Sequence, residues 1–147
     1  SEVLARFAAH FNYEPFAFDT ADAAGQPIYH TNVMMCVASA FALVGFDLIS
    51  SPRRAAGLRA RLEHSGREVI ALDTRQIAEF AGNALELRGR DGPILALSAR
   101  AGASLTAAQR AVIGRSARIV ALAVPTIEMA GGSVRCLLAG IHLSLRH

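Results

Sequence analysis

The spacing of apolar and polar residues changes several times along the chain, and each spacing predicts a different element. Residues 1–11 carry apolar side chains three and four positions apart, which is the period of one face of a helix. Residues 13–18 are predicted to form a strand. Residues 19–27, rich in Asp, Ala and Gly, are predicted to form a loop that leads to His30.

The rest of the chain alternates hairpins, helices and single strands, which predicts an α/β protein. Apolar runs at 33–38 and 41–46 are separated by Ser39-Ala40, the length of a tight hairpin. Capping residues mark the helix starts, as where Ser50 or Ser51 precedes Pro52. The further expected elements are, in chain order, a helix over 52–66, a strand over 68–72, a helix from Asp73 or Thr74 to Ala81, a turn at Gly82-Asn83, a hairpin of 84–87 with 94–97, a helix from Ser104 or Thr106 to 116, a strand over 118–124, a loop over 126–132 and a strand over 134–143.

This order of elements recurs with a fixed period. Loop residues fall at His30, Asn83 and Cys136, and both separations are 53 residues. The eight-residue segments that begin one position before each of them align without a gap. Repeated units cover one another's apolar faces, so the chain is predicted to hold about two and a half units of a larger array. If the units surround an axis, the three loop residues point at one central place.

Composition excludes several classes of protein. Apolar residues are 52% of the 147 and charged residues 18%, which is ample material for a core and excludes intrinsic disorder. The longest apolar stretch, 33–46, is too short to span a bilayer, so no membrane association is expected. The net charge of +3 comes from scattered arginines and no lysine, without the basic stripe and aromatic residues of nucleic-acid-binding proteins, so no nucleic-acid partner is expected.

The two cysteines, Cys36 and Cys136, lie too far apart in sequence to form a metal-binding pair. The default expectation is a cytoplasmic protein with reduced thiols. No metal or cofactor is expected. A cysteine and a histidine delivered to one point by equivalent turns favour a catalytic site over a metal site.

Three segments around these loop residues resemble the motifs of a known family. They are QPIYHTNVMMC at 26–36, FAGNALEL at 80–87 and AGGSVRCLLA at 130–139. In this order they are similar to the histidine, middle and nucleophile motifs of the arginine-deiminase-related hydrolases, which include the citrulline-utilisation hydrolases. That group belongs to the guanidino-group-modifying, or pentein, superfamily.

The resemblance implies a pentein-type, pseudo-fivefold α/β propeller with its active site on the axis. Family members are roughly twice as long, so residues 1–147 correspond to the C-terminal half of the catalytic domain. The family's acidic residues that hold the substrate lie mainly in the half that is not represented here. Either the missing half lies on another polypeptide or is replaced by a second copy of this chain, or the chain is an inactive remnant or partner subunit.

The resemblance also implies catalytic roles for Cys136 and His30. A cysteine thiolate attacks the central carbon of a guanidino or ureido group, and a histidine protonates the leaving nitrogen and then activates water. The expected function is therefore a cysteine-dependent hydrolase of arginine- or citrulline-like substrates. Transfer of the amidino group to an amine is an alternative. Structural alternatives are a buried, unreactive Cys136 and an interior His30.

Three further residues are candidates for substrate binding. Asn32 stands where many superfamily members carry an acid, which shifts the expectation toward a neutral ureido substrate. Asn83 either contacts substrate or holds its turn, since Asn tolerates left-handed backbone. Glu128 is one of the carboxylates nearest the loops in sequence, and its alternative role is a solvated loop acid. Gly131-Gly132 is expected to permit close backbone approach before Cys136.

Overall fold

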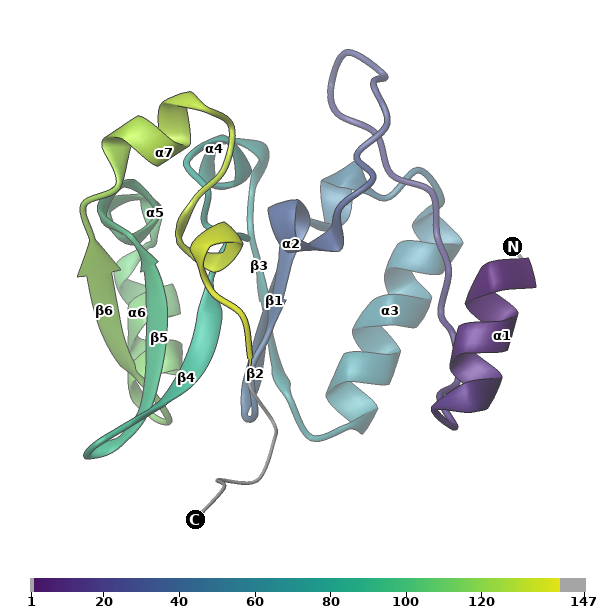
Figure 1. The fold of residues 1–147 in the computed structure, drawn as a ribbon, viewed down its shortest axis with the longest axis horizontal. Coiled ribbons are helices and arrows are strands. Elements are labelled where there is room, and N and C mark those ends of the chain that lie inside the picture. The colour runs from purple at the N-terminus through teal and green to yellow at the C-terminus, as the bar shows by residue number, and fades with distance from the viewer. Residues whose placement is uncertain (1, 141–147) are drawn as a thin grey trace.

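The computed structural model describes residues 2–140, which form seven α-helices, six strands and two short 3-10 helices (Figure 1). The α-helices are α1 (Glu2–His10), α2 (Thr31–Met34), α3 (Pro52–His64), α4 (Thr74–Ala78), α5 (Ala99–Ser104), α6 (Ala107–Gly114) and α7 (Pro125–Met129). The strands are β1 (Met35–Val37), β2 (Phe41–Val44), β3 (Glu68–Ala71), β4 (Leu85–Gly89), β5 (Gly92–Ser98) and β6 (Arg118–Leu122), and the 3-10 helices are η1 (Phe46–Leu48) and η2 (Val134–Leu137). No helix within 2–140 is long and apolar enough to cross a bilayer.

The strands form two mixed sheets with the same topology. In the first sheet, β1 and β2 form an antiparallel hairpin and β3 returns parallel to β2 after helix α3. In the second sheet, β4 and β5 form the hairpin and β6 is parallel to β5 after α5 and α6. The expected α/β class and both expected hairpins are therefore confirmed. The two sheets lie side by side, with α3 and then α1 beyond the first sheet (Figure 1).

Strand β2 contributes to two hydrophobic cores through its alternating side chains. Phe41 and Leu43 belong to a core shared with β5, α5 and α6 of the second unit. Ala42 and Val44 belong to a second core with Leu58 and other residues of α3. Since successive side chains of a strand point to opposite faces, the first sheet is covered on both faces and joins the two units.

Several helix ends follow capping rules that the sequence displays. Ser51 caps α3 with Pro52 at the first helical position, and α3 ends at His64, two residues before Gly66, whose positive φ of 82° suits glycine. The predicted helix from Asp73 is shorter than expected. It ends at Ala78 and not at Ala81, because Phe80 adopts the left-handed conformation (φ 64°) and closes the helix before Gly82.

A pair of side-chain amides, of which Gln76 is buried and Gln109 partly buried, joins the two units. Helices α4 and α6 each begin with a capping box, Asp73 with Gln76 and Thr106 with Gln109. The two glutamines exchange hydrogen bonds, Gln76 Nε2 donating to Gln109 Oε1 at 2.7 Å and Gln109 Nε2 to Gln76 Oε1 at 3.2 Å. The caps of consecutive units are therefore held by one reciprocal pair.

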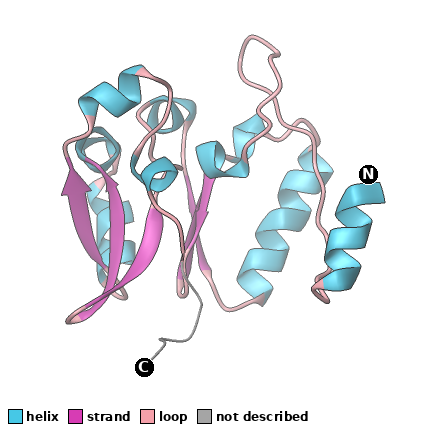
Figure 2. Cartoon of the chain, viewed as in Figure 1, coloured by secondary structure: helices cyan, strands magenta, loops and turns pink. Residues whose placement is uncertain are grey.

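The predicted strand over 13–18 is wrong. This segment forms no strand in the described structure and is drawn as loop between α1 and α2 (Figure 2). Its aromatic ring at Phe16 lies on α3, where the guanidinium carbons of Arg54 and Arg61 are 5.3 and 5.2 Å from the ring centroid. The alternating aromatic residues reflect packing against a helix and not a place in a sheet.

The expected elements at the C-terminal end also need correction. Residues 126–132, predicted as a loop, include most of α7, which starts at Pro125. Residues 134–137 form η2, and 138–140 form no strand, where a strand over 134–143 was predicted. Positions 141–143 lie outside the described residues. Helix α5, capped by Ser98, was not predicted at all.

We expect Gln76→Ala and Gln109→Ala each to lower the free energy of unfolding by about 1–3 kcal/mol, because each leaves buried polar partners unsatisfied. The double variant should lose less than the sum, since both changes break the same pair. Chemical denaturation with a matched Gln26→Ala control, at an exposed loop position, measures both effects. Strictly additive losses would contradict the proposed coupling between the two caps.

Candidate active site

Two of the three equivalent loop residues are in contact. Asn83 Nδ2 donates a hydrogen bond to Cys136 Sγ at 3.3 Å, although the two residues are 53 positions apart. Asn32, two residues after His30, donates from its own Nδ2 to the same sulfur at 3.9 Å. Cys136 lies in η2 and is exposed to solvent. The structure therefore brings Cys136, Asn83 and Asn32 together around an accessible sulfur.

Asn83 is the buried centre of this cluster, with only 3% of its surface exposed. Besides the sulfur, its Nδ2 donates to the backbone carbonyl of Asn32 at 3.1 Å, and its Oδ1 accepts from the backbone N–H of Arg135 at 3.0 Å. One side chain therefore connects helix α2, which precedes β1, with the turn that carries Cys136. This supports the turn-holding role considered for Asn83.

His30 immediately precedes α2 and is exposed. Its ring centroid lies 4.8 Å from that of Tyr29, and its backbone carbonyl accepts from Val33 N at 3.1 Å. The imidazole makes no side-chain capping bond to α2. His30 is thus at the start of the short helix whose Asn32 reaches Cys136, and its ring is available to solvent.

Glu128 is buried in the last turn of α7, 7% exposed, and not a solvated loop acid. Its Oε1 accepts from the hydroxyl of Ser133 at 3.3 Å, and Ser133 directly precedes η2. The carboxylate therefore contacts the turn that carries Cys136 but makes no hydrogen bond to the sulfur. Its role in binding substrate stays a prediction.

The two glycines before Cys136 have different roles. Gly131 follows α7 with φ 85°, and the N–H groups of Gly131 and Gly132 donate to Glu128 O and Ile127 O at 3.1 and 3.3 Å. This is a Schellman ending, which favours glycine at the left-handed position. A Cβ at Gly132 would lie 3.6 Å from the nearest atom, an ordinary contact. Helix termination explains the glycine at 131, and neither position makes the close approach that was expected.

Close backbone approach occurs instead at Gly82, which was expected only to form part of a turn. A Cβ at this position would lie 2.5 Å from the carbonyl oxygen of Val33 and 2.8 Å from the carbonyl carbon of Met34. Both are backbone atoms of α2, so no side chain can move aside. Only glycine at 82 lets the loop of Asn83 pack directly against the helix of Asn32.

The two cysteines have opposite environments. Cys36 is buried in β1, and its burial raises the pKa of the thiol to about 11. The Arg135 guanidinium, which donates to the Met35 carbonyl at 2.8 Å, opposes this rise only in part. Cys36 is therefore a neutral core thiol at physiological pH. Within residues 2–140, no group of three or more His, Cys, Asp or Glu could hold a metal ion.

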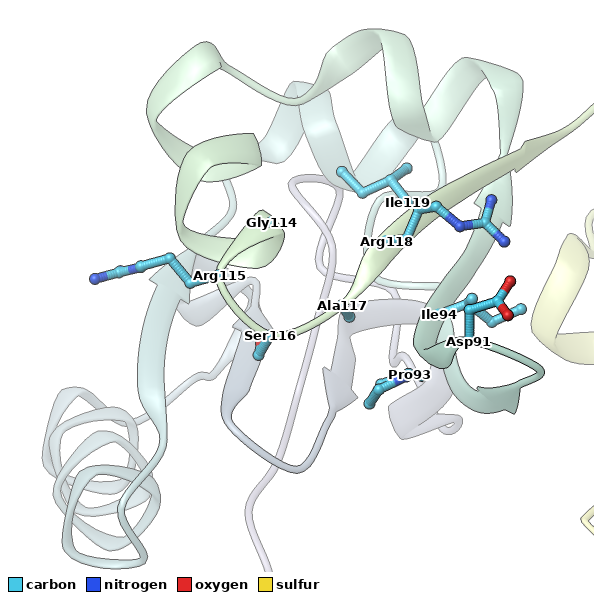
Figure 3. A pocket seen from close by; sticks show the side chains of 10 residues that line it. Asp91, Pro93, Ile94, Gly114, Arg115, Ser116, Ala117, Arg118 and Ile119 are labelled. Atoms are coloured by element: carbon cyan, nitrogen blue, oxygen red, sulfur yellow. The ribbon is translucent and has the colours of Figure 1, made fainter.

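A hollow of the described structure lies away from this cluster. It has a volume of about 710 Å³ and is lined by the β4–β5 turn and the start of β6, at the opposite end of β4 from Asn83 (Figure 3). Asp91 and Arg118 lie on one side of it, and the Arg115 side chain extends away. None of the predicted site residues lines this hollow, which is therefore separate from the cluster around Cys136.

Comparison with known proteins agrees with this arrangement of mixed sheets and loops. The chain belongs to the family of the N,N dimethylarginine dimethylhydrolases, eukaryotic, whose family model matches residues 1–143. The expected relation to the guanidino-group-modifying, or pentein, superfamily is thereby confirmed. No curated protein matches the chain.

Solved structures share the fold at low sequence identity. The N-terminal domain of ArgZ, an arginine dihydrolase from the ornithine–ammonia cycle in cyanobacteria, was solved as a cysteine-to-serine mutant bound to substrate. It has a TM-score of 0.69 and 14% identity, over 92% of this chain and 45% of that one. Apo ArgZ has a TM-score of 0.68 and 14% identity, over 92% and 20% of the two chains. AgrE, in a ternary complex with ornithine and NAD+, has a TM-score of 0.61 and 16% identity, over 82% and 16%. The chain thus spans less than half of the ArgZ domain.

We expect Gly82→Ala to lower the free energy of unfolding by about 1–3 kcal/mol, because the added methyl group overlaps backbone atoms that cannot yield without displacing α2. Gly114→Ala is the matched control, since a Cβ there meets no atom within 4 Å. It should be neutral or slightly stabilising. Thermal and urea unfolding compare the two variants, and equal stability would show that the Gly82 loop is free to move.

Proposed function

We propose that the protein is a cysteine-dependent hydrolase of the guanidino or ureido group of arginine- or citrulline-like substrates, with Cys136 as nucleophile. The observation that carries this proposal is the exposed sulfur of Cys136, which accepts a hydrogen bond from Asn83 at 3.3 Å. A solvent-accessible sulfur that faces hydrogen-bond donors suits a reactive thiolate, whereas Cys36 has the burial of a structural cysteine. Membership of a dimethylarginine dimethylhydrolase family supports the same chemistry.

The reaction follows from these groups. The Cys136 thiolate forms a C–S bond to the central carbon of the substrate, and the C–N bond to the leaving nitrogen breaks as His30 gives it a proton. The products of this step are ammonia or an amine and a covalent adduct on the sulfur. Water then attacks the same carbon, giving a proton to His30, and the C–S bond breaks. When a guanidino group is the substrate, the released product carries a ureido group and the thiolate is regenerated.

The positions of His30 and Glu128 suit the roles of proton transfer and substrate binding. His30 is exposed at the start of α2, whose Asn32 already reaches the sulfur. Glu128 is a buried carboxylate behind the turn of Cys136, where a cationic group of the substrate would be attracted to it.

Turnover by the purified protein tests the proposal. We expect release of ammonia or an amine from at least one of arginine, Nω-methylated arginine and citrulline, and complete loss of this activity in Cys136→Ala, because the nucleophile is gone. The amidine 2-chloroacetamidine should place one adduct on Cys136 and stop turnover in parallel. Mass spectrometry of the native protein locates the adduct, and chromatography of the amino-acid products measures turnover.

The matched control is Cys36→Ala, which removes the other thiol from the core and should retain both activity and the adduct. At pH 7–8 the raised pKa of Cys36 keeps its thiol protonated, so this residue should react only after unfolding or at a pH near 11. Equal labelling of both cysteines, and only in the unfolded chain, would contradict the nucleophile assignment.

We also propose that the chain works within a larger assembly that supplies the missing units of a propeller. Helix α1 leaves a cluster of aromatic rings exposed: Phe7 is 54%, Phe11 52% and Tyr13 66% exposed, and the centroids of Phe7 and Phe11 are 4.7 Å apart. At the other end, Leu122 of β6 is 41% exposed on the second sheet. Apolar groups exposed in such numbers are typical of surfaces that pack against another unit.

We expect the 147-residue chain to sediment as a species heavier than its 15.5 kDa monomer, because exposed rings on α1 favour association. The double variant Phe7→Glu with Phe11→Glu should shift it toward the monomer. Ala9→Glu, about 200° round the helix from Phe7, adds a charge to an exposed position of α1 away from the rings and should not. A soluble, compact wild-type monomer would contradict the incomplete-propeller proposal.

A further inference from the structure

The direction of the Asn83 carboxamide is fixed by its two backbone partners. A backbone N–H can only donate and a backbone carbonyl can only accept. Since Arg135 N–H occupies Oδ1 at 3.0 Å and the Asn32 carbonyl occupies Nδ2 at 3.1 Å, the amide cannot turn over without losing both bonds. Its N–H group therefore has to face Cys136 Sγ, 3.3 Å away. The fold presents a donor to this sulfur.

Asn32 has the same polarity toward the sulfur. Its Nδ2 is 3.9 Å from Sγ, whereas its Oδ1 is buried and accepts no hydrogen bond in the described structure. Turning this amide over would offer an acceptor to a protonated S–H group, but Asn32 instead directs its N–H there. A thiol sulfur is a weak acceptor and a thiolate is a strong one. Two donors around one sulfur are therefore an arrangement for negative charge.

The charge of the neighbouring arginine is directed elsewhere. The Arg135 guanidinium donates to the carbonyl of Met35 in β1, and only the backbone N–H of Arg135 takes part in the cluster. Within the described residues, the side chains hydrogen-bonded to Cys136 are thus the two neutral amides. Neutral donors stabilise an anion without adding a cation that would repel a guanidinium substrate.

We propose that Asn83, assisted by Asn32, is a positioning residue that holds the Cys136 sulfur as a thiolate by donating amide hydrogen bonds to it. This inference rests on the proposed role of Cys136 as nucleophile. It assigns two separate functions to one side chain: Oδ1 and one N–H of Nδ2 fix the loops through Arg135 N–H and the Asn32 carbonyl, and the other N–H of Nδ2 acts on the sulfur. A purely structural Asn83 would need only the first function.

The isosteric variant Asn83→Asp separates the contact of Oδ1 from the contacts of Nδ2. It keeps an oxygen to accept from Arg135 N–H but replaces the donor to the sulfur and to the Asn32 carbonyl with a second carboxylate oxygen. At pH 8 we expect the rate of alkylation of Cys136 by iodoacetamide to fall by about fivefold or more, while hydrogen exchange of the Arg135 amide remains as slow as in the wild type. Asn83→Ala should lose both the reactivity and the slow exchange. Asn12→Asp, on the exposed turn after α1, controls for the added charge.

A role of Asn83 in fixing the loop alone predicts a different rate of alkylation. If Asn83 only fixes the loop, Asn83→Asp will be alkylated as fast as the wild type, and reactivity will follow the exchange rate of Arg135 across the variants. That result overturns the proposal. Failure of the proposed function itself is distinguishable, because the native wild-type protein would then lack selective alkylation at Cys136 before any variant is compared.

Asn32→Ala provides a test that does not depend on changing the buried Asn83. This variant removes the weaker donor together with a buried oxygen that has no partner, so the protein should unfold at the same denaturant concentration as the wild type or higher. Alkylation of Cys136 should slow by about twofold, and Asn32→Asp should slow it further. Unchanged rates in both variants would exclude a donor role for Asn32, and unchanged rates in the Asn83 variants as well would exclude it for the pair.

Discussion

The structure depends on the direct contact between two loops that begin consecutive units. Gly82 brings its backbone so close to Val33 and Met34 that no side chain fits between them, and Asn83 then bonds to the Asn32 carbonyl. This contact fixes α2 relative to the second sheet. Because Asn83 also holds Arg135 N–H, the turn of Cys136 is fixed by the same side chain. A single amide therefore sets the geometry of three segments that are distant in sequence.

The units are joined away from the loops by a second set of amides. Gln76 and Gln109 each complete a helix cap within one unit and bond to each other between units. Together with the core shared by β2, β5 and α6, these bonds make the two sheets one body. The loop cluster rests on this body, because α2 and the turn of Asn83 each lead directly into one of the two joined sheets.

Much of this arrangement could be predicted from the sequence, and the reasons for success and failure are local. The 53-residue spacing indicated that Asn83 and Cys136 share a place, because equivalent positions of repeated units lie in equivalent loops. Apolar runs and capping residues predicted both hairpins and helix α3.

The failed predictions also have local reasons. The segment from Tyr13 to Phe18 was misjudged because alternation of aromatic residues is the same whether they face a sheet or a helix. Residues 134–137 were misjudged because a short apolar run does not distinguish a strand from a 3-10 turn. Helix α7 was missed although Pro125 and Gly131 mark its two ends.

What the sequence could not give is the direction of hydrogen bonds at the sulfur. An Asn in a turn motif is compatible with substrate contact, with loop support or with a role toward the cysteine, and composition does not choose among them. In the structure, the Asn83 amide has a backbone N–H as partner on one side and a backbone carbonyl on the other. These partners allow only one orientation of the amide, in which its N–H faces the sulfur. The same reasoning explains why Asn32 tolerates a buried, unpartnered oxygen. The free-energy penalty of that oxygen is acceptable if the amide N–H on the other side faces a charged sulfur, because hydrogen bonds to charged groups are stronger than those between neutral ones.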